Sequence, residues 1–88
     1  MSVKITIPGH LQQYVNNNEI VEVEGKTVNE CLRNLNWKYP AIAPEVFDIN
    51  GDMAVIVLHE GIPIDDSKIN SPVKDGDNIV MFPIIIGG

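Results

Sequence analysis

The chain has 88 residues, which suits one small domain, since domains typically contain about 100–150 residues. Its 44% hydrophobic and 20% charged residues are typical of a soluble globular domain. The net charge of −6 argues against a nucleic-acid partner, because affinity for phosphates comes largely from Lys and Arg. The same charge favours a partner protein with a basic patch, through long-range steering.

Features that bear on the cellular compartment point to the cytoplasm. The single cysteine, Cys31, cannot form an internal disulfide, so we expect a reducing compartment. Residues 1–8 alternate apolar and polar and lack the continuous apolar core of a signal peptide. The longest strongly apolar run, Ala54–Leu58, is far shorter than the ~20 residues of a membrane helix. The sequence therefore predicts a cytoplasmic protein with no membrane partner.

The first part of the chain predicts a β-hairpin. Residues 3–7 alternate apolar and polar, which is the period of a half-buried strand, and a Pro-Gly pair follows them. A polar loop around residues 16–18 leads to a second alternating segment, Glu19–Glu24. We expect these two strands to pair with each other.

A helix is predicted after the hairpin. Thr27 and Glu30 fit a capping box, in which the Thr27 hydroxyl accepts a hydrogen bond from the Glu30 amide and the Glu30 carboxylate reaches back. The apolar residues that follow fall within a narrow arc at about 100° per residue: Val28, Cys31, Leu32, Leu35 and Tyr39. Pro40 disfavours a helical conformation at Tyr39 and marks the end of the helix.

The next segment predicts two strands joined by a turn. A short helical turn around residues 45–47 and a turn at Gly51-Asp52 precede the apolar run Ala54–Leu58. A continuous apolar run of this length is suited to a strand buried on both faces. His59-Glu60-Gly61 then turns the chain back through Ile62–Ile64.

The last strand follows a crossover loop over residues 65–74 and a tight turn. Asp75-Gly76-Asp77 is typical of such a turn, because glycine adopts a positive φ at little cost. Ile79–Phe82 forms the strand, and Pro83 argues against a central position in the sheet from there onward.

This order of elements predicts an α+β fold in which one mixed sheet packs on a single main helix. The first and last strands would lie side by side and parallel at the centre, because the helix supplies the crossover that parallel neighbours require. The sequence shows no internal repeat, so residues 1–88 are expected to form one domain with an extended tail over residues 83–88.

The tail from Pro83 to Gly88 is the most informative segment. Its isoleucines are followed by Gly87-Gly88, whereas a disordered terminus would normally be longer and more polar. A terminal Gly-Gly has no side chains, so it can thread a narrow channel and present the Gly88 carboxylate to the α-phosphate of a nucleotide. Adenylation would turn a poor acyl group into one that sulfide or a thiolate can attack.

Together with Asp75-Gly76-Asp77, the apolar last strand and Pro83, this tail resembles that of the ubiquitin-like β-grasp sulfur carriers. This family includes the small subunit of molybdopterin synthase and the thiamin sulfur carrier. The resemblance covers Val3 to Gly88. The chain length and the segment Pro40–Asp52 are more similar to the molybdopterin type than to the shorter thiamin type. The segment also resembles that of carriers that deliver sulfur for cysteine synthesis.

The resemblance implies a carrier with no catalytic residues and no bound cofactor of its own. A ubiquitin-activating-like adenylyltransferase would use ATP and Mg²⁺ to adenylate Gly88, and a sulfur donor would convert the adenylate into a thiocarboxylate. The carrier would then dock with a sulfur-accepting synthase subunit. The residues implied in threading and docking are Ile84, Ile85, Ile86 and Gly87 in the tail, with Phe82 and Pro83 at the partner interface.

The tail also departs from the molybdopterin type. Members of that type often have a second proline after the position of Pro83, and then smaller apolar residues, where this chain has Ile84, Ile85 and Ile86. β-branched side chains restrict χ1 and favour an extended tail, which suits threading. Because these side chains are larger, the identity of the enzyme that accepts the sulfur does not follow from the resemblance.

Two alternatives to the sulfur carrier stay open. The first is a ubiquitin-like protein modifier joined through Gly88 to lysines of target proteins, which begins with the same adenylation. The second is a β-grasp binding module whose tail has no covalent role.

Other residues of chemical interest have structural interpretations. Cys31 lies on the apolar arc of the helix, so we expect a buried packing residue. His10 and His59 have no cysteine or carboxylate at ligand spacing, which argues against a metal site. Trp37 points away from the apolar arc, and is either an exposed partner contact or a residue covered by Pro40–Phe47.

Overall fold

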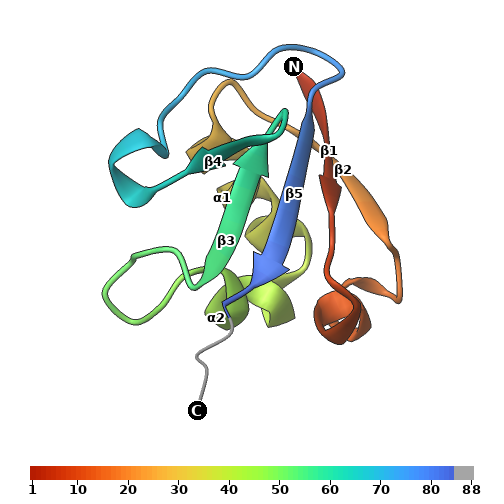
Figure 1. Ribbon diagram of the computed structural model, residues 1–88. Coiled ribbons are helices and arrows are strands. Elements are labelled where there is room, and N and C mark those ends of the chain that lie inside the picture. The colour runs from red at the N-terminus through yellow and green to blue at the C-terminus, as the bar shows by residue number, and fades with distance from the viewer. Residues whose placement is uncertain (85–88) are drawn as a thin grey trace.

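A computed structural model describes residues 1–84 and shows a five-stranded sheet with the helices on one of its faces (Figure 1). The strands are β1 (Ser2–Thr6), β2 (Ile20–Glu24), β3 (Val55–His59), β4 (Ile62–Ile64) and β5 (Asn78–Pro83). The α-helices are α1 (Val28–Lys38) and the single turn α2 (Ala43–Val46). Three short 3-10 helices complete the described chain: η1 (Gly9–Val15), η2 (Pro40–Ile42) and η3 (Asp66–Lys68).

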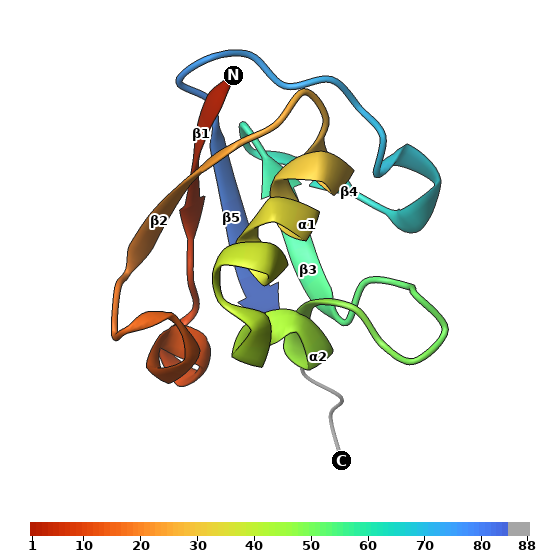
Figure 2. The same cartoon turned by 180° about the vertical axis from the view of Figure 1, so that it is seen from behind.

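The strands are arranged in the order β2-β1-β5-β3-β4. β1 and β5 are parallel, with Ile5 opposite Ile79, and the other neighbouring strands are antiparallel. The predicted hairpin and the predicted central parallel pair are therefore both confirmed. Figure 2 shows α1 lying across one face of this sheet, and we call the opposite face the open face.

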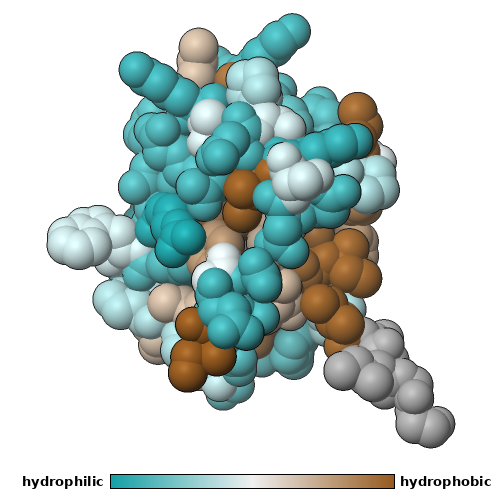
Figure 3. All heavy atoms as spheres, turned by 90° about the vertical axis from the view of Figure 1, so that its left-hand side faces the viewer, coloured by the Kyte–Doolittle hydropathy of each residue, from teal (hydrophilic) through white to brown (hydrophobic). Residues whose placement is uncertain are grey.

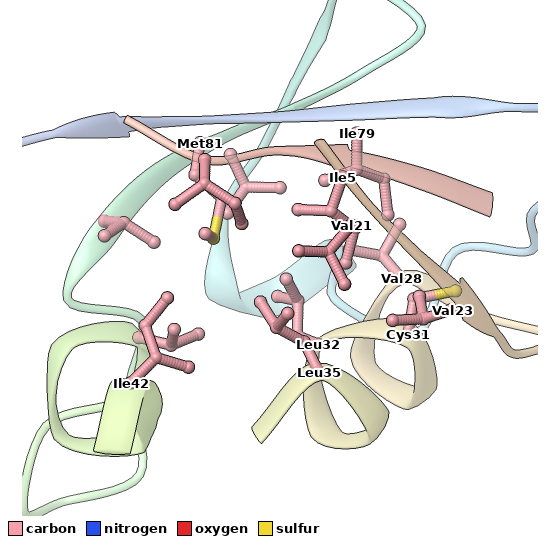
Figure 4. Close-up of a cluster of buried hydrophobic side chains, with 14 of the residues drawn as sticks. Ile5, Val21, Val23, Val28, Cys31, Leu32, Leu35, Ile42, Ile79 and Met81 are labelled. Atoms are coloured by element: carbon pink, nitrogen blue, oxygen red, sulfur yellow. The ribbon is translucent and has the colours of Figure 1, made fainter. Parts of the chain in front are cut away.

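The hydrophobic core lies between the sheet and α1. Figure 4 shows Ile5, Ile79 and Met81 extending from the sheet toward Leu32 and Leu35 of α1. All five side chains are at most 1% exposed. Fully burying an aliphatic side chain of this size contributes about 1.5–3 kcal/mol, so this contact holds the helix on the sheet.

The ends of α1 are where the sequence places them. Thr27 is the N-cap, and its Oγ1 accepts a hydrogen bond from Glu30 N at 3.1 Å, which confirms that half of the predicted capping box. The helix ends at Lys38 with Tyr39 as its C-cap, directly before Pro40. No helix of residues 1–84 is long and apolar enough to cross a membrane.

The three 3-10 helices were not predicted, and the longest of them, η1, has a mostly polar sequence. Gly9–Val15 forms η1, and its Leu11 and Val15 are buried in the core. The segment contains only these two buried apolar residues, which are too few to show a helical period. The loop predicted around residues 16–18 follows η1, with Asn16 and Asn17 at positive φ.

The prediction that Ala54–Leu58 is buried on both faces is wrong. β3 alternates instead: Val55 and Val57 are buried, whereas Ile56 is 46% exposed. The reason is that the helices in residues 1–84 cover only one face of the sheet, so alternate side chains of β3 reach the open face.

Candidate functional site

The last described residues leave the sheet from its central strand. β5 lies between β1 and β3, and its pairing continues to Pro83, which lies opposite Val55. Within β5, Ile79 and Met81 point into the core, and the alternate residues Val80 and Phe82 point to the open face. β5 is thus held by neighbours on both edges and anchored in the core up to the last described residues.

The turn Asp75-Gly76-Asp77 fixes the start of β5 against β1. Asp75 Oδ1 accepts a hydrogen bond from Ser2 N at 2.8 Å, and Gly76 N donates to Ser2 O at 2.7 Å. Asp77 O accepts from Lys4 N at 3.0 Å. Gly76 has a φ of +86°, which confirms the predicted role of glycine in this turn. The motif therefore sets the register of the strand that carries the tail.

The side chain of Asp77 joins this turn to the end of β3. Asp77 Oδ2 lies 2.8 Å from His59 Nε2 and also accepts from Lys74 N at 2.8 Å. The hydrogen bond with His59, and then that from Lys74, lower the pKa of the Asp77 carboxyl. The sequence did not indicate this pair, because the two residues are 18 positions apart and meet only across the β3–β5 pairing.

A second carboxylate holds the start of β5 from the β3–β4 turn. Glu60 Oε2 accepts a hydrogen bond from Asn78 N at 2.7 Å, and Glu60 N donates to Asn78 O at 3.0 Å. Acidic side chains of the turn before β5 and of the β3–β4 turn therefore bind the start of β5 to both of its neighbouring strands.

An exposed apolar patch covers the other end of β5 on the open face. Ile56 lies directly opposite Phe82, and Leu58 opposite Val80, so these side chains form two cross-strand pairs. Ile56, Phe82 and Ile84 are 46%, 44% and 49% exposed. Figure 3 shows hydrophobic side chains gathered on one side of the molecule. We name Ile56, Leu58, Val80, Phe82 and Ile84 the open-face patch.

The structure places some of the predicted site residues and leaves others outside its range. Phe82 and Ile84 belong to the open-face patch, and Pro83 ends the β5 pairing between them. The roles predicted for Ile85, Ile86, Gly87 and Gly88 concern residues outside the described part of the chain, so those roles stay predictions. The sequence indicated Phe82 as an interface residue but gave no sign of Ile56, which it placed in a strand buried on both faces.

The single cysteine and the candidate metal ligands have structural roles or none within residues 1–84. Cys31 is fully buried, as predicted, and burial, followed by the nearby charge of Glu30, raises the pKa of its thiol to about 11. It is therefore a protonated packing residue rather than a nucleophile. Within residues 1–84 no three His, Cys, Asp or Glu side chains are grouped so as to hold a metal ion.

Trp37 is exposed, so the alternative in which Pro40–Phe47 covers it is wrong. Its side chain is 86% accessible on the outer side of α1. The segment after α1 packs its own apolar side chains, Ile42, Val46 and Phe47, into the core instead. Trp37 lies on a different surface from the open-face patch.

A mixed sheet with a central parallel pair and one main helix defines a β-grasp domain of the ubiquitin-like class, and solved structures confirm this fold. SAMP1 from Haloferax volcanii superposes with a TM-score of 0.84 over all of both chains, at 24% sequence identity. A chain of the BexX/CysO complex from Amycolatopsis orientalis gives a TM-score of 0.83 at 22% identity, over 98% of this chain and 99% of that chain.

Sequence comparison defines the family within this class. The model of the ThiS family matches residues 5–88. Ubiquitin-related modifier 1 from Encephalitozoon cuniculi is 35% identical over 100 residues, covering 98% of this chain and all of that protein. The chain therefore belongs to the ThiS family, which comprises sulfur carriers and ubiquitin-like modifiers.

Proposed function

We propose that this protein is a sulfur carrier whose working group is the carboxylate of Gly88. The observation that carries the proposal is the open-face patch, which exposes Ile56, Phe82 and Ile84 around the end of the central strand β5. An enzyme that receives the tail can bury this patch at the same time. Membership of the ThiS family, whose match extends to residue 88, supports the assignment of the chemistry to Gly88.

The proposed chemistry takes place in two steps on an activating enzyme. A carboxylate oxygen of Gly88 attacks the α-phosphorus of ATP, and pyrophosphate leaves. Mg²⁺ would help to neutralise the negative charge of the phosphates. A sulfur donor at the oxidation state of hydrosulfide then attacks the carbonyl carbon of the adenylate, and AMP leaves with the electrons of the C–O bond. The product is a thiocarboxylate. On a second enzyme its sulfur would displace a leaving group from the acceptor molecule, and water would then cleave the C–S bond at Gly88, which leaves the sulfur on the acceptor and restores the carboxylate.

This protein contributes recognition and presentation rather than catalysis. Its thiol is buried and protonated, and within residues 1–84 no three His, Cys, Asp or Glu side chains are grouped so as to hold a metal ion. The adenylyltransferase would supply the nucleotide site, and a sulfur-accepting synthase subunit would supply the site of sulfur transfer. A net charge of −6 would steer the carrier toward basic surfaces on both partners.

The acceptor that we propose first is a molybdopterin precursor. The length of the chain and the segment Pro40–Asp52 are similar to those of the molybdopterin-type carriers, and thiamin and cysteine synthesis are the next candidates. We place the reaction in the cytoplasm, where ATP is available and a free thiol such as Cys31 stays reduced.

The proposal is tested by incubating the purified protein with its activating enzyme, ATP, Mg²⁺ and sulfide. We expect release of one equivalent of pyrophosphate and an intact-mass increase equal to the replacement of one oxygen by one sulfur, located at Gly88 by fragmentation. The control variant lacks Gly88 and should fold normally, because that residue lies beyond the last described strand. A mass increase in the truncated variant would contradict the proposal.

The second candidate is a protein modifier, and the similarity to ubiquitin-related modifier 1 favours it. Both functions begin with adenylation of Gly88, so pyrophosphate release does not separate them. The modifier predicts higher-mass conjugates in cell extracts that disappear when Gly88 is deleted. The carrier predicts a thiocarboxylate and sulfur transfer to a small molecule.

A further inference from the structure

β2 is an edge strand whose outward backbone groups are open to another strand. Ile7 N donates to Glu19 O at 2.8 Å and Gly25 N donates to Met1 O at 3.0 Å, so the backbone N–H and C=O groups of the odd-numbered residues of β2 point toward β1. In an antiparallel pair, successive residues of a strand direct these groups to opposite edges. The N–H and C=O groups of Ile20, Glu22 and Glu24 therefore point away from β1. Within residues 1–84, β2 has no second neighbouring strand.

One hydrogen bond supports this orientation of the β2 edge. The carbonyl of Glu24 accepts from Asn34 Nδ2 of α1 at 2.6 Å, so it points toward the helix and not toward β1. The backbone groups of Ile20 and Glu22, further along the same edge, have no such side chain bonded to them among the described residues. The edge is thus closed at one end and open along the rest of the strand.

A groove of about 450 Å³ runs between this edge and α1. Its lining comes from β2 and from three positions of α1 that are three and four residues apart, and so share one side of the helix. The lining residues are Glu22, Val23, Glu24, Asn34, Trp37 and Lys38. Trp37, at 86% exposure, leaves a large aromatic surface beside open backbone groups.

The charges on β2 decide which strand can pair with its edge. An antiparallel pair of two β2 strands centred on Glu22 would place Glu22 opposite Glu22, and like charges directly opposite are destabilising. The net charge of −6 on each chain adds repulsion between two copies. The Met1 ammonium lies 3.2 Å from Glu24 Oε2, so Glu22 carries the charge of this edge that no cation of the described residues contacts. A second copy is therefore disfavoured, and a strand with basic side chains is favoured.

We propose that the edge of β2 binds an extended segment of a partner protein in which basic and apolar residues alternate. Successive side chains of a strand point to opposite faces, so the basic residues would lie beside Glu22 and Glu24 while the apolar residues enter the groove against Trp37. Backbone hydrogen bonds to Ile20 and Glu22 would supply affinity, and the alternation would supply specificity. This site is separate from the open-face patch and does not depend on the function of Gly88.

The experiment uses the full chain and a terminally blocked peptide in which Lys and Val alternate. Trp37 is the single tryptophan, so its fluorescence reports binding directly. By NMR we expect the amide signals of Ile20, Glu22 and Glu24 to shift and the Glu22 amide to exchange more slowly with solvent. The amides of Val21 and Val23, already paired with β1, should exchange at an unchanged rate.

Matched variants and peptides make the outcome decisive. Replacing both Glu22 and Glu24 with Gln should weaken binding about five- to tenfold at low salt, and Trp37→Ala should weaken it about tenfold. A peptide with Glu in place of Lys, or one methylated on alternate backbone nitrogens, should not bind. The proposal would be overturned if the Glu peptide bound, or if the amide shifts were confined to the open-face patch. It would also be overturned if the Glu22 amide signal did not change at millimolar peptide, or if two copies of the chain formed dimers through β2.

Discussion

Gly76 shows how one residue controls the position of the proposed site. Its φ of +86° lies in a region that other residues adopt only with strain, and its amide donates to Ser2 O in the contact that sets the register of β5 against β1. An added Cβ would meet no atom within 4 Å, so the backbone conformation alone selects glycine here. The effect of a substitution at this position can therefore be attributed to φ.

Replacing Gly76 with alanine is expected to lower the free energy of unfolding by about 1–2 kcal/mol. Urea denaturation followed by circular dichroism measures this difference. Gly9→Ala is the matched control, because a Cβ there also meets no atom within 4 Å and its φ lies outside the left-handed region. The control should change stability by less than about 0.5 kcal/mol, and equal losses in the two variants would contradict the account of the turn.

The contact of Asp77 with His59 predicts a pH dependence of stability. Hydrogen bonds from His59 and Lys74 lower the pKa of Asp77 below its ordinary value of 3.8. A carboxyl group with a lowered folded-state pKa stabilises the fold above its unfolded-state value, and this contribution is lost as the pH falls through the folded-state value.

We therefore expect wild type to be more stable than Asp77→Asn at neutral pH, with the difference shrinking as the pH falls below about 4. Thermal unfolding across that pH range measures the effect. His59→Ala should remove much of the same pH dependence, since the hydrogen bond with His59 is the largest cause of the lowered pKa. Parallel stability curves for wild type and Asp77→Asn would show that the pair does not affect folding.

At the scale of elements, β3 and β5 each present one set of side chains to the core and another to the open face. The core set holds the strand pair on α1, and the exposed set forms the open-face patch. Because Ile56 and Phe82 are nearly half exposed, they contribute less to folding than their buried neighbours. Their replacement should consequently affect partner binding more than stability.

Phe82→Asp and Ile56→Asp are expected to lower the kcat/KM of adenylation by about 10- to 30-fold, through loss of apolar contact with the activating enzyme. Their stability should fall by less than about 1.5 kcal/mol, which thermal unfolding checks separately. Ile49→Asp is the matched control, because it makes the same change at a fully exposed isoleucine of the loop between α2 and β3, outside the open-face patch. Equal losses of activity in Ile56→Asp and Ile49→Asp would refute docking through the open-face patch.

The elements that the sequence predicted correctly have local causes. The alternation in β1 and β2, the Thr27 cap and Pro40 after α1 each depend on residues close together in the chain. The features that were missed depend on tertiary structure. Ile56 is exposed because the helices cover one face only, Asp77 meets His59 across a strand pair, and the buried face of η1 consists of two residues.

At the scale of the whole molecule, the fold provides a central strand, β5, that leads to Ile84, the open-face patch around the end of that strand and a separate groove at the β2 edge. The central parallel pair could be predicted from the order of elements and the resemblance of the tail. The groove could not, because it requires the relative positions of β2 and α1. The function proposed for the molecule depends on the chemistry of one functional group, the carboxylate of Gly88.

The most direct test of that function is the intact mass of the protein purified rapidly from its own cells, without added enzyme or ATP. We predict a population heavier by the replacement of one oxygen with one sulfur, with fragmentation placing the sulfur on Gly88. This population should disappear when the activating enzyme is deleted. A homogeneous unmodified mass in both strains, under conditions that preserve a synthetic thiocarboxylate standard, would contradict the proposal that this protein carries sulfur.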